Sequence, residues 1–243
     1  MSLFEFDKSI GLLITMHDEY NTVYNTLTNV MGDCKYIGIA QSGDTKAKEI
    51  EDLLGQSGRF EEGIFTYRTL PNLGDKYSKW ELPSRAVCRN YSRLFSDYKK
   101  ANVCDEADAD YMVCITGDTL LWNLWGIDTI IDGMIEKGCN VGCARAFNES
   151  FHSDELTLEH FESGGDGGGR LQDSSNDDFM PQMFVVGKDL VGAYSDISIT
   201  NKWCSEQCLG DTMNKSKGLP YIFAWEAYGF ADGVVYNYKG DTV

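Results

Sequence analysis

Long hydrophobic runs are missing from this sequence of 243 residues, whose apolar stretches reach only about ten residues. A helix that crosses a bilayer needs about 20 such residues, so we expect no transmembrane segment. Positive charge is also scarce, because 21 Lys and Arg residues stand against 38 Asp and Glu residues, a net charge of −17. This negative excess repels polyphosphate backbones and anionic lipid surfaces, so we expect no nucleic-acid partner.

The sequence also has few prolines and no recognisable targeting signal. Only 4 prolines occur, whereas hydrophobic residues make up 42% and aromatic residues 12% of the chain, which is typical of one packed globular domain. No N-terminal signal sequence is recognisable, so we expect the eight cysteines to be reduced thiols of a cytoplasmic protein. Two pairs at four-residue spacing, Cys139 with Cys143 and Cys204 with Cys208, leave a zinc site open, although the short Cys-x-x-Cys knuckle is lacking.

The first 145 residues alternate between strand and helix patterns, which is typical of a parallel sheet with helical crossovers. Short apolar stretches predict the strands, and apolar residues at helical spacing, such as Tyr20, Val23 and Leu27, predict the helices. We expect strands at residues 10–15, 36–40 and 64–68, within 109–121, and at 140–147. We expect helices over 20–31, 83–102 and 127–138, and a further helix within 42–55 that follows a cap residue and ends at a Gly.

The regular alternation ends near residue 146. Residues 148–178 are polar and rich in glycine, so we expect a mobile loop that serves as a lid or a linker. Its GGDGGGR stretch lacks the Lys and Ser/Thr of a phosphate-binding P-loop. Further on we predict a strand within 181–191, a helix over 203–218 and a closing aromatic hairpin formed by 221–230 and 234–240. No internal repeat or second domain boundary is visible in the sequence.

A carboxylate follows the fourth expected strand. The stretch ADYMVCITGDTLL, residues 109–121, places Asp118 where a buried strand emerges into solvent. Ligands of open α/β sheets collect at the carboxyl ends of strands, and an Asp there can hold a divalent cation that neutralises a diphosphate. The alternative is an Asp that only caps the following turn.

Several local motifs together resemble one known family. Three stretches resemble the ends of its strands, and these are ITMHDEYNTVYNTLTNV, KYIGIAQSGDT and ADYMVCITGDTLL. A fourth stretch resembles its Asn-Leu-Gly loop and the Ala-Arg-Asn helix that follows, and this is LPNLGDKYSKWELPSRAVCRNYSRLF. The family is that of the family 2 glycosyltransferases of the GT-A fold. The resemblance implies a three-layer α/β/α sandwich with a mostly parallel sheet. It also implies a nucleotide-diphosphate sugar donor and Mn²⁺ or Mg²⁺. Residues 10–145 would form the nucleotide-sugar half of one domain spanning 1–243, and residues 146–243 the acceptor half.

The resemblance implies roles by position. His17, Asp18 and Glu19 would lie beside the base and ribose, Ser42, Gly43 and Asp44 would face the base, Arg85 and Arg89 would bind the diphosphate, and Asp118 would hold the metal. Two departures from the family pattern stand out. The family's two or three metal-binding carboxylates are reduced to Asp118 in the sequence Thr-Gly-Asp-Thr, and the usual Asp pair of the second strand is Gln41 and Ser42.

An inverting transfer needs a general base, which the family keeps near the start of a late helix. The closest match is SEQCLGD, which makes Glu206 the candidate base and Asp211 its substitute. Glu206 fits equally well as an acidic residue that stabilises the first turn of a helix. His152 and His160 are alternative metal ligands, and Trp122 and Trp125 are candidates for contact with an acceptor, which could be a small molecule, a glycan or a protein.

Two other classes of function stay open. A GT-A-fold protein that binds nucleotide sugars without catalysis would also account for the reduced metal motif. A nucleotidyltransferase would have a similar fold, but it normally carries a Gly-rich basic loop after the first strand, and the stretch MHDEYNT lacks both features.

Overall fold

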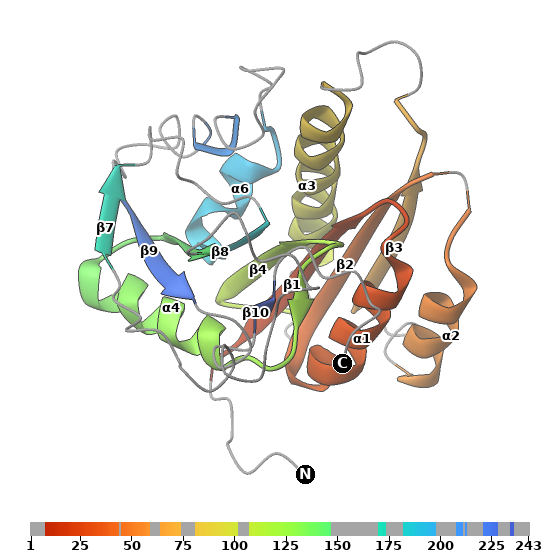
Figure 1. The fold of residues 1–243 in the computed structure, drawn as a ribbon, viewed down its shortest axis with the longest axis horizontal. Helices are drawn as coiled ribbons and strands as arrows, with labels where there is room; N and C mark the ends of the chain where they lie inside the picture. The colour runs from red at the N-terminus through yellow and green to blue at the C-terminus, as the bar shows by residue number, and fades with distance from the viewer. Residues whose placement is uncertain are drawn as a thin grey trace.

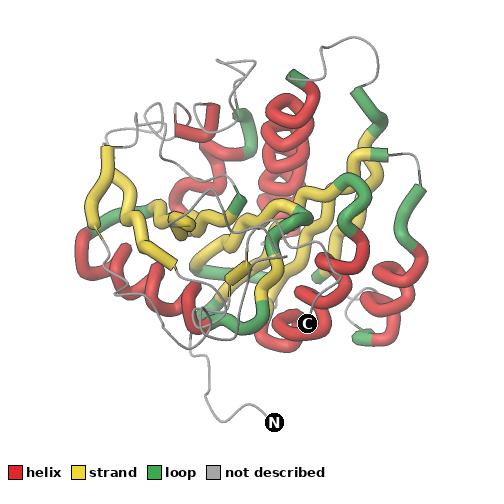
Figure 2. The backbone as a smooth tube through the Cα atoms, in the orientation of Figure 1, coloured by secondary structure: helices red, strands yellow, loops and turns green. Residues whose placement is uncertain are grey.

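The computed structural model describes residues 8–43, 45–58, 64–73, 81–101, 107–146, 170–173, 182–197, 208–210, 212, 221–227 and 234–235. Within these residues the chain forms a central sheet with helices on both faces (Figure 1, Figure 2). No helix of the described residues has the length and apolar character needed to cross a membrane.

Eight strands form the central sheet in the order β3-β2-β1-β4-β8-β6-β9-β7. Six of them run in one direction, whereas β8 and β7 are antiparallel to their neighbours. The sheet is therefore mostly parallel, as expected. The strands are β1 (Ile10–Met16), β2 (Cys34–Ser42), β3 (Phe65–Leu70), β4 (Tyr111–Thr116), β6 (Val141–Ala146), β7 (Arg170–Asp173), β8 (Met183–Gly187) and β9 (Tyr221–Ala227), and β5 (Leu120–Leu121) pairs separately with β10 (Val234–Val235).

Two hydrophobic layers separate the sheet from its helices, and this confirms the three-layer α/β/α arrangement. The alternation along β2 shows how both layers are filled, because Ile37 and Ile39 enter one layer while Tyr36 and Ala40 enter the other. Helices α1 (Tyr20–Val30), α2 (Lys48–Gln56) and α4 (Trp125–Lys137) cover the first face, and α3 (Leu82–Ala101) and α6 (Val191–Tyr194) cover the second, with short 3₁₀ turns η1 (Met31–Asp33) and η4 (Lys188–Leu190).

Most expected elements of the first 145 residues are confirmed within two or three residues. The helix predicted within 42–55 is found at Lys48–Gln56, and it begins there because Gln41 holds the Thr45 carbonyl and the Tyr67 hydroxyl holds the Ala47 N–H. The six described cysteines are buried thiols outside any disulfide, in agreement with the prediction of reduced thiols.

The predicted C-terminal hairpin is wrong. Strand β9 lies between β6 and β7 in the central sheet, and β10 pairs with β5. Backbone pairing with β9 also turns Arg170–Asp173 into strand β7, so the loop predicted over 148–178 is interrupted there; its other residues lie outside the described part. The helix predicted over 203–218 is confirmed at 208–210 and 212, where Cys208 and Leu209 are buried against the α3 face of the sheet.

Candidate functional site

The carboxyl ends of β1, β2 and β4 meet at one edge of the sheet. The three strands are adjacent and parallel, with Thr15 opposite Thr116 and Met16 opposite Gln41. The residues that follow these positions therefore leave the sheet side by side. This is the edge where open α/β sheets bind their ligands.

The ends of β1 and β2 are joined through His17. Its Nδ1 lies 2.7 Å from the backbone oxygen of Ser42, so Nδ1 carries the proton and donates it to that carbonyl. The backbone N–H of His17 donates to Glu19 Oε2 at 2.7 Å. The side chains of His17 and Asp18 are exposed and that of Glu19 is half-buried, so the segment presents imidazole and carboxylate groups at the sheet edge.

The turn that carries Asp118 packs directly against Glu19. A Cβ placed on Gly117 would lie 2.6 Å from Glu19 Oε2 and 2.9 Å from the Cβ of Met16, so only glycine fits between the ends of β1 and β4. The hydroxyl of Thr116 donates to Oδ1 of Asp118, which is half-buried. The turn itself is closed by backbone, because the Thr119 N–H donates to the Thr116 carbonyl at 3.0 Å. The second oxygen of Asp118 has no bonding partner among the described residues.

Helix α3 brings a cation to the end of β2. Arg89 donates from Nη2 to Ser42 Oγ at 3.3 Å and from Nη1 to the Pro71 carbonyl at 2.7 Å. Asn90 holds the same serine, with its amide nitrogen 3.1 Å from Ser42 Oγ. Burial lowers the pKa of the Arg89 guanidinium, and no carboxylate of the described residues forms an ion pair with it. Arg89 is therefore a partly desolvated positive charge bonded only to neutral groups.

Arg85, one turn earlier on α3, has a different environment. Its guanidinium forms a loose ion pair with Glu81, at 3.9 Å between Nη2 and Oε1. The two arginines expected at a diphosphate therefore differ in the described structure, since Arg89 reaches the end of β2 and Arg85 pairs with Glu81, the residue directly before α3.

Gln41 has a role that the sequence did not reveal. Its side-chain amide donates to the Thr45 carbonyl at 2.8 Å and to the Tyr20 hydroxyl at 3.1 Å, while its Oε1 accepts from the Tyr67 hydroxyl at 2.5 Å. Burial raises the pKa of Tyr67 to about 12, so the hydroxyl stays a donor at neutral pH. Gln41 thus holds the turn between β2 and α2, and its polar atoms are used within the fold.

The structure describes three more of the predicted residues, Gly43, Trp122 and Trp125. Gly43 follows Ser42 with φ near +153°, a conformation that favours glycine, and its N–H donates to the Leu70 carbonyl. Trp122 and Trp125 are 47% and 58% exposed, so they are surface residues and contribute little to the core. The remaining candidates fall outside the described residues, and these are Asp44, His152, His160, Glu206 and Asp211.

The described residues suit one kind of metal binding only. They contain no group of three or more His, Cys, Asp or Glu side chains placed to hold an ion, which also leaves the zinc alternative at Cys139 and Cys143 without support. Asp118 offers one oxygen at the strand ends. That donor set fits Mg²⁺ or Mn²⁺ that takes its other ligands from phosphate oxygens and water, because Mg²⁺ keeps much of its hydration shell. It does not fit a metal centre built from protein ligands alone.

One solved structure supports the fold of this chain. The chain matches no protein-family model and no curated protein sequence. Its structure is similar to the crystal structure of S. aureus TarS 1–349, with a TM-score of 0.50 and 11% identity over 92% of this chain and 61% of that chain. It is less similar to the crystal structure of UDP-glucose pyrophosphorylase complexed with UDP-glucose, with a TM-score of 0.42 and 10% identity over 93% of this chain and 94% of that chain. For the apo form of UDP-glucose pyrophosphorylase the TM-score is 0.41, with 9% identity over 93% of this chain and 93% of that chain.

At 11% identity the similarity to TarS concerns architecture, and this chain spans 61% of that protein's length. It supports the α/β fold expected from the sequence.

Proposed function

We propose that this chain is a glycosyltransferase that moves a sugar from a nucleotide-diphosphate donor to an acceptor. The observation that carries the proposal is the meeting of three strand ends. His17 after β1 bonds Ser42 at the end of β2, and the turn of Asp118 after β4 packs against Glu19. An imidazole, carboxylates and an arginine are thereby gathered where such sheets bind their ligands.

The charge around Ser42 suits a diphosphate. Arg89 is partly buried and bonded to the neutral oxygens of Ser42 and Pro71, so an anion placed there would supply a counter-charge that the described residues do not provide. We assign Arg89 to the diphosphate, with Arg85 as a more distant contributor. His17, Asp18 and Glu19 would contact the ribose and base from one side, and Ser42, Gly43 and Asp44 from the other.

Asp118 is the proposed ligand of Mn²⁺ or Mg²⁺. The ion would supply positive charge that stabilises the leaving diphosphate. The Thr116 hydroxyl fixes the orientation of the Asp118 carboxylate. The close fit of Gly117 against Glu19 fixes the position of the turn relative to the end of β1. These contacts pre-organise one carboxylate oxygen toward the donor before it binds.

The chemical step that we propose is an inverting transfer. A carboxylate base removes the proton of the acceptor hydroxyl as its oxygen attacks the anomeric carbon. A new carbon–oxygen bond forms, the bond between the anomeric carbon and the diphosphate oxygen breaks, and the nucleoside diphosphate leaves with the electron pair. We assign the base to Glu206, with Asp211 as the substitute.

Calorimetric titration with UDP and GDP, with and without Mn²⁺, tests this proposal. We expect one nucleotide to bind more tightly with Mn²⁺, and Asp118→Asn to remove that metal dependence. Asp196→Asn is a matched control, because Asp196 is an exposed aspartate that forms no ion pair among the described residues. Absence of binding by either nucleotide, or a metal effect that survives Asp118→Asn, would contradict the proposal.

A second candidate is a protein that binds nucleotide sugars without transferring them. The observation that favours it is that the described strand ends provide Asp118 where the family commonly has two or three carboxylates. Slow hydrolysis of the nucleotide sugar by the wild-type chain, measured as free nucleoside diphosphate, separates the two. Binding of the donor without hydrolysis or transfer would favour the binding protein.

A further inference from the structure

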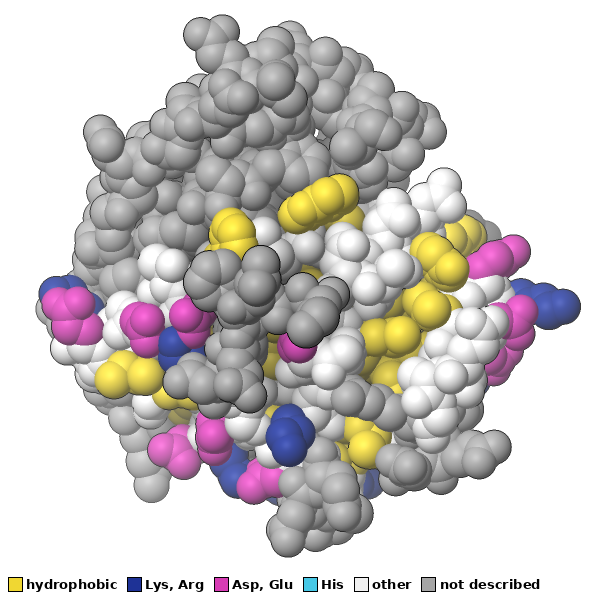
Figure 3. Space-filling view, turned by 90° about the horizontal axis from the view of Figure 1, so that it is seen from below, with side chains coloured by type: hydrophobic (Ala, Val, Ile, Leu, Met, Phe, Trp, Pro, Cys, Tyr) yellow, Lys and Arg dark blue, Asp and Glu magenta, His cyan; other side chains and the backbone are white. Residues whose placement is uncertain are grey.

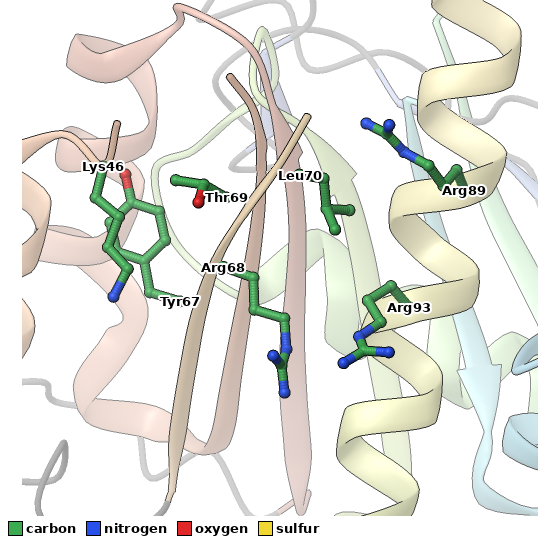
Figure 4. Close-up of a pocket in the computed structure, with 7 residues that line it drawn as sticks. All are labelled: Lys46, Tyr67, Arg68, Thr69, Leu70, Arg89 and Arg93. Atoms are coloured by element: carbon green, nitrogen blue, oxygen red, sulfur yellow. The ribbon is translucent and has the colours of Figure 1, made fainter. Parts of the chain in front are cut away.

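A cationic pocket lies along the free edge of the sheet, beside the candidate donor site. It has a volume of about 400 Å³, and its walls come from edge strand β3, from α3 and from the turn before α2 (Figure 4). We call it the edge pocket, and the residues that matter to its chemistry are Lys46, Tyr67, Arg68, Thr69, Arg89 and Arg93.

The edge pocket gathers positive charge in a strongly acidic chain. On the face of the molecule shown in Figure 3, basic side chains are scattered singly. In the edge pocket four cations lie together, while the net charge of the chain is −17. Such a concentration attracts anions, and the low-dielectric wall of the sheet strengthens the attraction.

Nearby acids balance only part of this charge. Arg68 and Arg93 share one carboxylate, that of the buried Asp97, with 3.0 Å between Arg68 Nη2 and Oδ1 and 3.4 Å between Arg93 Nε and Oδ2. Lys46 pairs with Glu51 at 3.2 Å. Arg89 has no carboxylate partner in the described part of the chain. Among the described residues, the ion pairs of these four cations therefore involve two carboxylates, those of Asp97 and Glu51.

Hydrogen-bond donors remain available toward the pocket. Figure 4 shows the guanidinium groups of Arg68 and Arg93 turned toward one another between β3 and α3. Arg68 uses Nε and Nη2 on Asp97, so its Nη1 has no partner among the described residues, and the same holds for both Nη atoms of Arg93. Two guanidinium groups that face each other in this way match the oxygens of a phosphate group.

The backbone of β3 adds further donors. The carbonyls of Ile64 and Leu70 accept hydrogen bonds from β2, and alternate residues of a strand bond to the same neighbouring strand. The N–H groups of Tyr67 and Thr69 therefore point away from β2, toward the edge, and the Thr69 hydroxyl lies beside them in the pocket wall. Backbone N–H groups at a sheet edge can bind anions.

One wall of the pocket is apolar and suits an organic group. The Tyr67 ring lies under the ammonium of Lys46, 5.2 Å from ring centroid to Nζ, and its hydroxyl is already bonded to Gln41. Leu70 lines the pocket from the other face of β3, on the side of α3. A volume of about 400 Å³ lies within the range of small-molecule sites.

We propose that the edge pocket is a binding site for a small phosphate-bearing molecule, whose phosphate group lies between Arg68 and Arg93. The organic part would contact Leu70, which lies on the same face of β3 as Arg68. This site goes beyond the proposed transferase function, because it is centred one helical turn along α3 from Arg89 and on the outer side of β3. Arg89 borders both sites.

Titration calorimetry at constant ionic strength, with inorganic phosphate and with glucose 6-phosphate as ligands, tests the site. We expect Arg93→Gln and Lys46→Gln each to weaken the binding of phosphate about tenfold, because each removes one charged donor. Arg93 is the first choice since its side chain is 43% exposed and lies 3.4 Å from Asp97, and thermal unfolding checks that the variant is folded. Lys99→Gln is the control, because Lys99 is an exposed lysine of the same helix that does not line the pocket.

The outcomes separate this site from the donor site. If both proposals hold, Arg93→Gln retains Mn²⁺-dependent binding of UDP or GDP, and Asp118→Asn retains binding of phosphate. Tighter binding of glucose 6-phosphate than of inorganic phosphate would assign the site to an organic phosphate, and equal binding would assign it to free phosphate. The proposal is overturned if neither ligand binds, or if both bind the Arg93→Gln and Lys46→Gln variants as tightly as the wild type.

Discussion

Replacing Gly117 by alanine tests whether the ends of β1 and β4 fit as closely as the candidate site requires. The new Cβ would lie 2.9 Å from the Cβ of Met16 and 3.1 Å from the Cβ of Glu19, and both atoms are fixed by the backbone of β1 and its turn. It would also lie 2.6 Å from Glu19 Oε2, which accepts the hydrogen bond of the His17 N–H. The clash can be relieved only by moving the turn or by breaking that bond.

The expected cost follows from these contacts. Overpacking a filled site costs about 1–3 kcal/mol, and the threatened hydrogen bond to a charged acceptor places Gly117→Ala in the upper part of that range. For a chain of this size we expect the melting temperature to fall by about 4–12 °C. We also expect weaker nucleotide binding, because the turn that carries Asp118 must shift.

Denaturant unfolding and nucleotide titration of Gly117→Ala measure these effects. Gly32→Ala provides the control, because a Cβ at Gly32 would meet nothing within 4 Å. The reasoning is refuted if Gly117→Ala unfolds within about 0.5 kcal/mol of the wild type and binds nucleotide equally well.

Three further predictions address the base, an ion-pair cluster and the N-terminal strand. Glu206→Gln should abolish sugar transfer and leave donor binding intact, which product assays and calorimetry will check; unchanged turnover would remove Glu206 as the base. Asp97→Asn should lower the free energy of unfolding by about 2 kcal/mol, less than for a fully buried pair because the Arg68 side chain is 40% exposed, and should tighten phosphate binding by removing the competing acid. Lys8 forms an ion pair with Asp128; partial burial alone would lower its pKa, but its bonds to acids of α4 outweigh this and raise the pKa above 10.5. The difference in free energy of unfolding between the wild type and Lys8→Met should therefore stay constant from neutral pH up to pH 10.5 and vanish as the pH rises through the higher folded-state pKa of Lys8. Denaturant midpoints of both proteins at several pH values will test this.

The nucleotide half of the fold was predictable because its signals are local. Buried strands such as Ile10–Met16 are short apolar runs, and the helix that follows repeats apolar residues such as Val23 and Leu27 at helical spacing. Parallel order then places all their carboxyl ends at one edge, so the neighbourhood of His17, Ser42 and Asp118 follows from topology alone.

Long-range pairing was not predictable. Strand β9 and the segment Val234–Val235 look like the two arms of a hairpin, yet β9 pairs with β6 and β7. Its partners are more than 40 residues away in the sequence, as the register of Gly142 with Phe223 shows, and no local turn signal encodes such a choice. The role of Gln41 was hidden for the same reason, because its acceptor atom is fixed by Tyr67 from β3.

The distribution of positive charge links the two proposed sites. A chain with a net charge of −17 has acids enough to pair every cation, yet Arg89 is partly buried with no carboxylate partner among the described residues, and Arg68 and Arg93 share the carboxylate of Asp97. Burying a charge without a counter-charge costs stability, so a fold selected for stability alone would place an acid beside these arginines. Departures from local consistency of this kind concentrate at functional sites. The edge of β3 and the end of β2 are therefore the places in the described structure where a bound anion would relieve a cost that the protein itself leaves uncompensated.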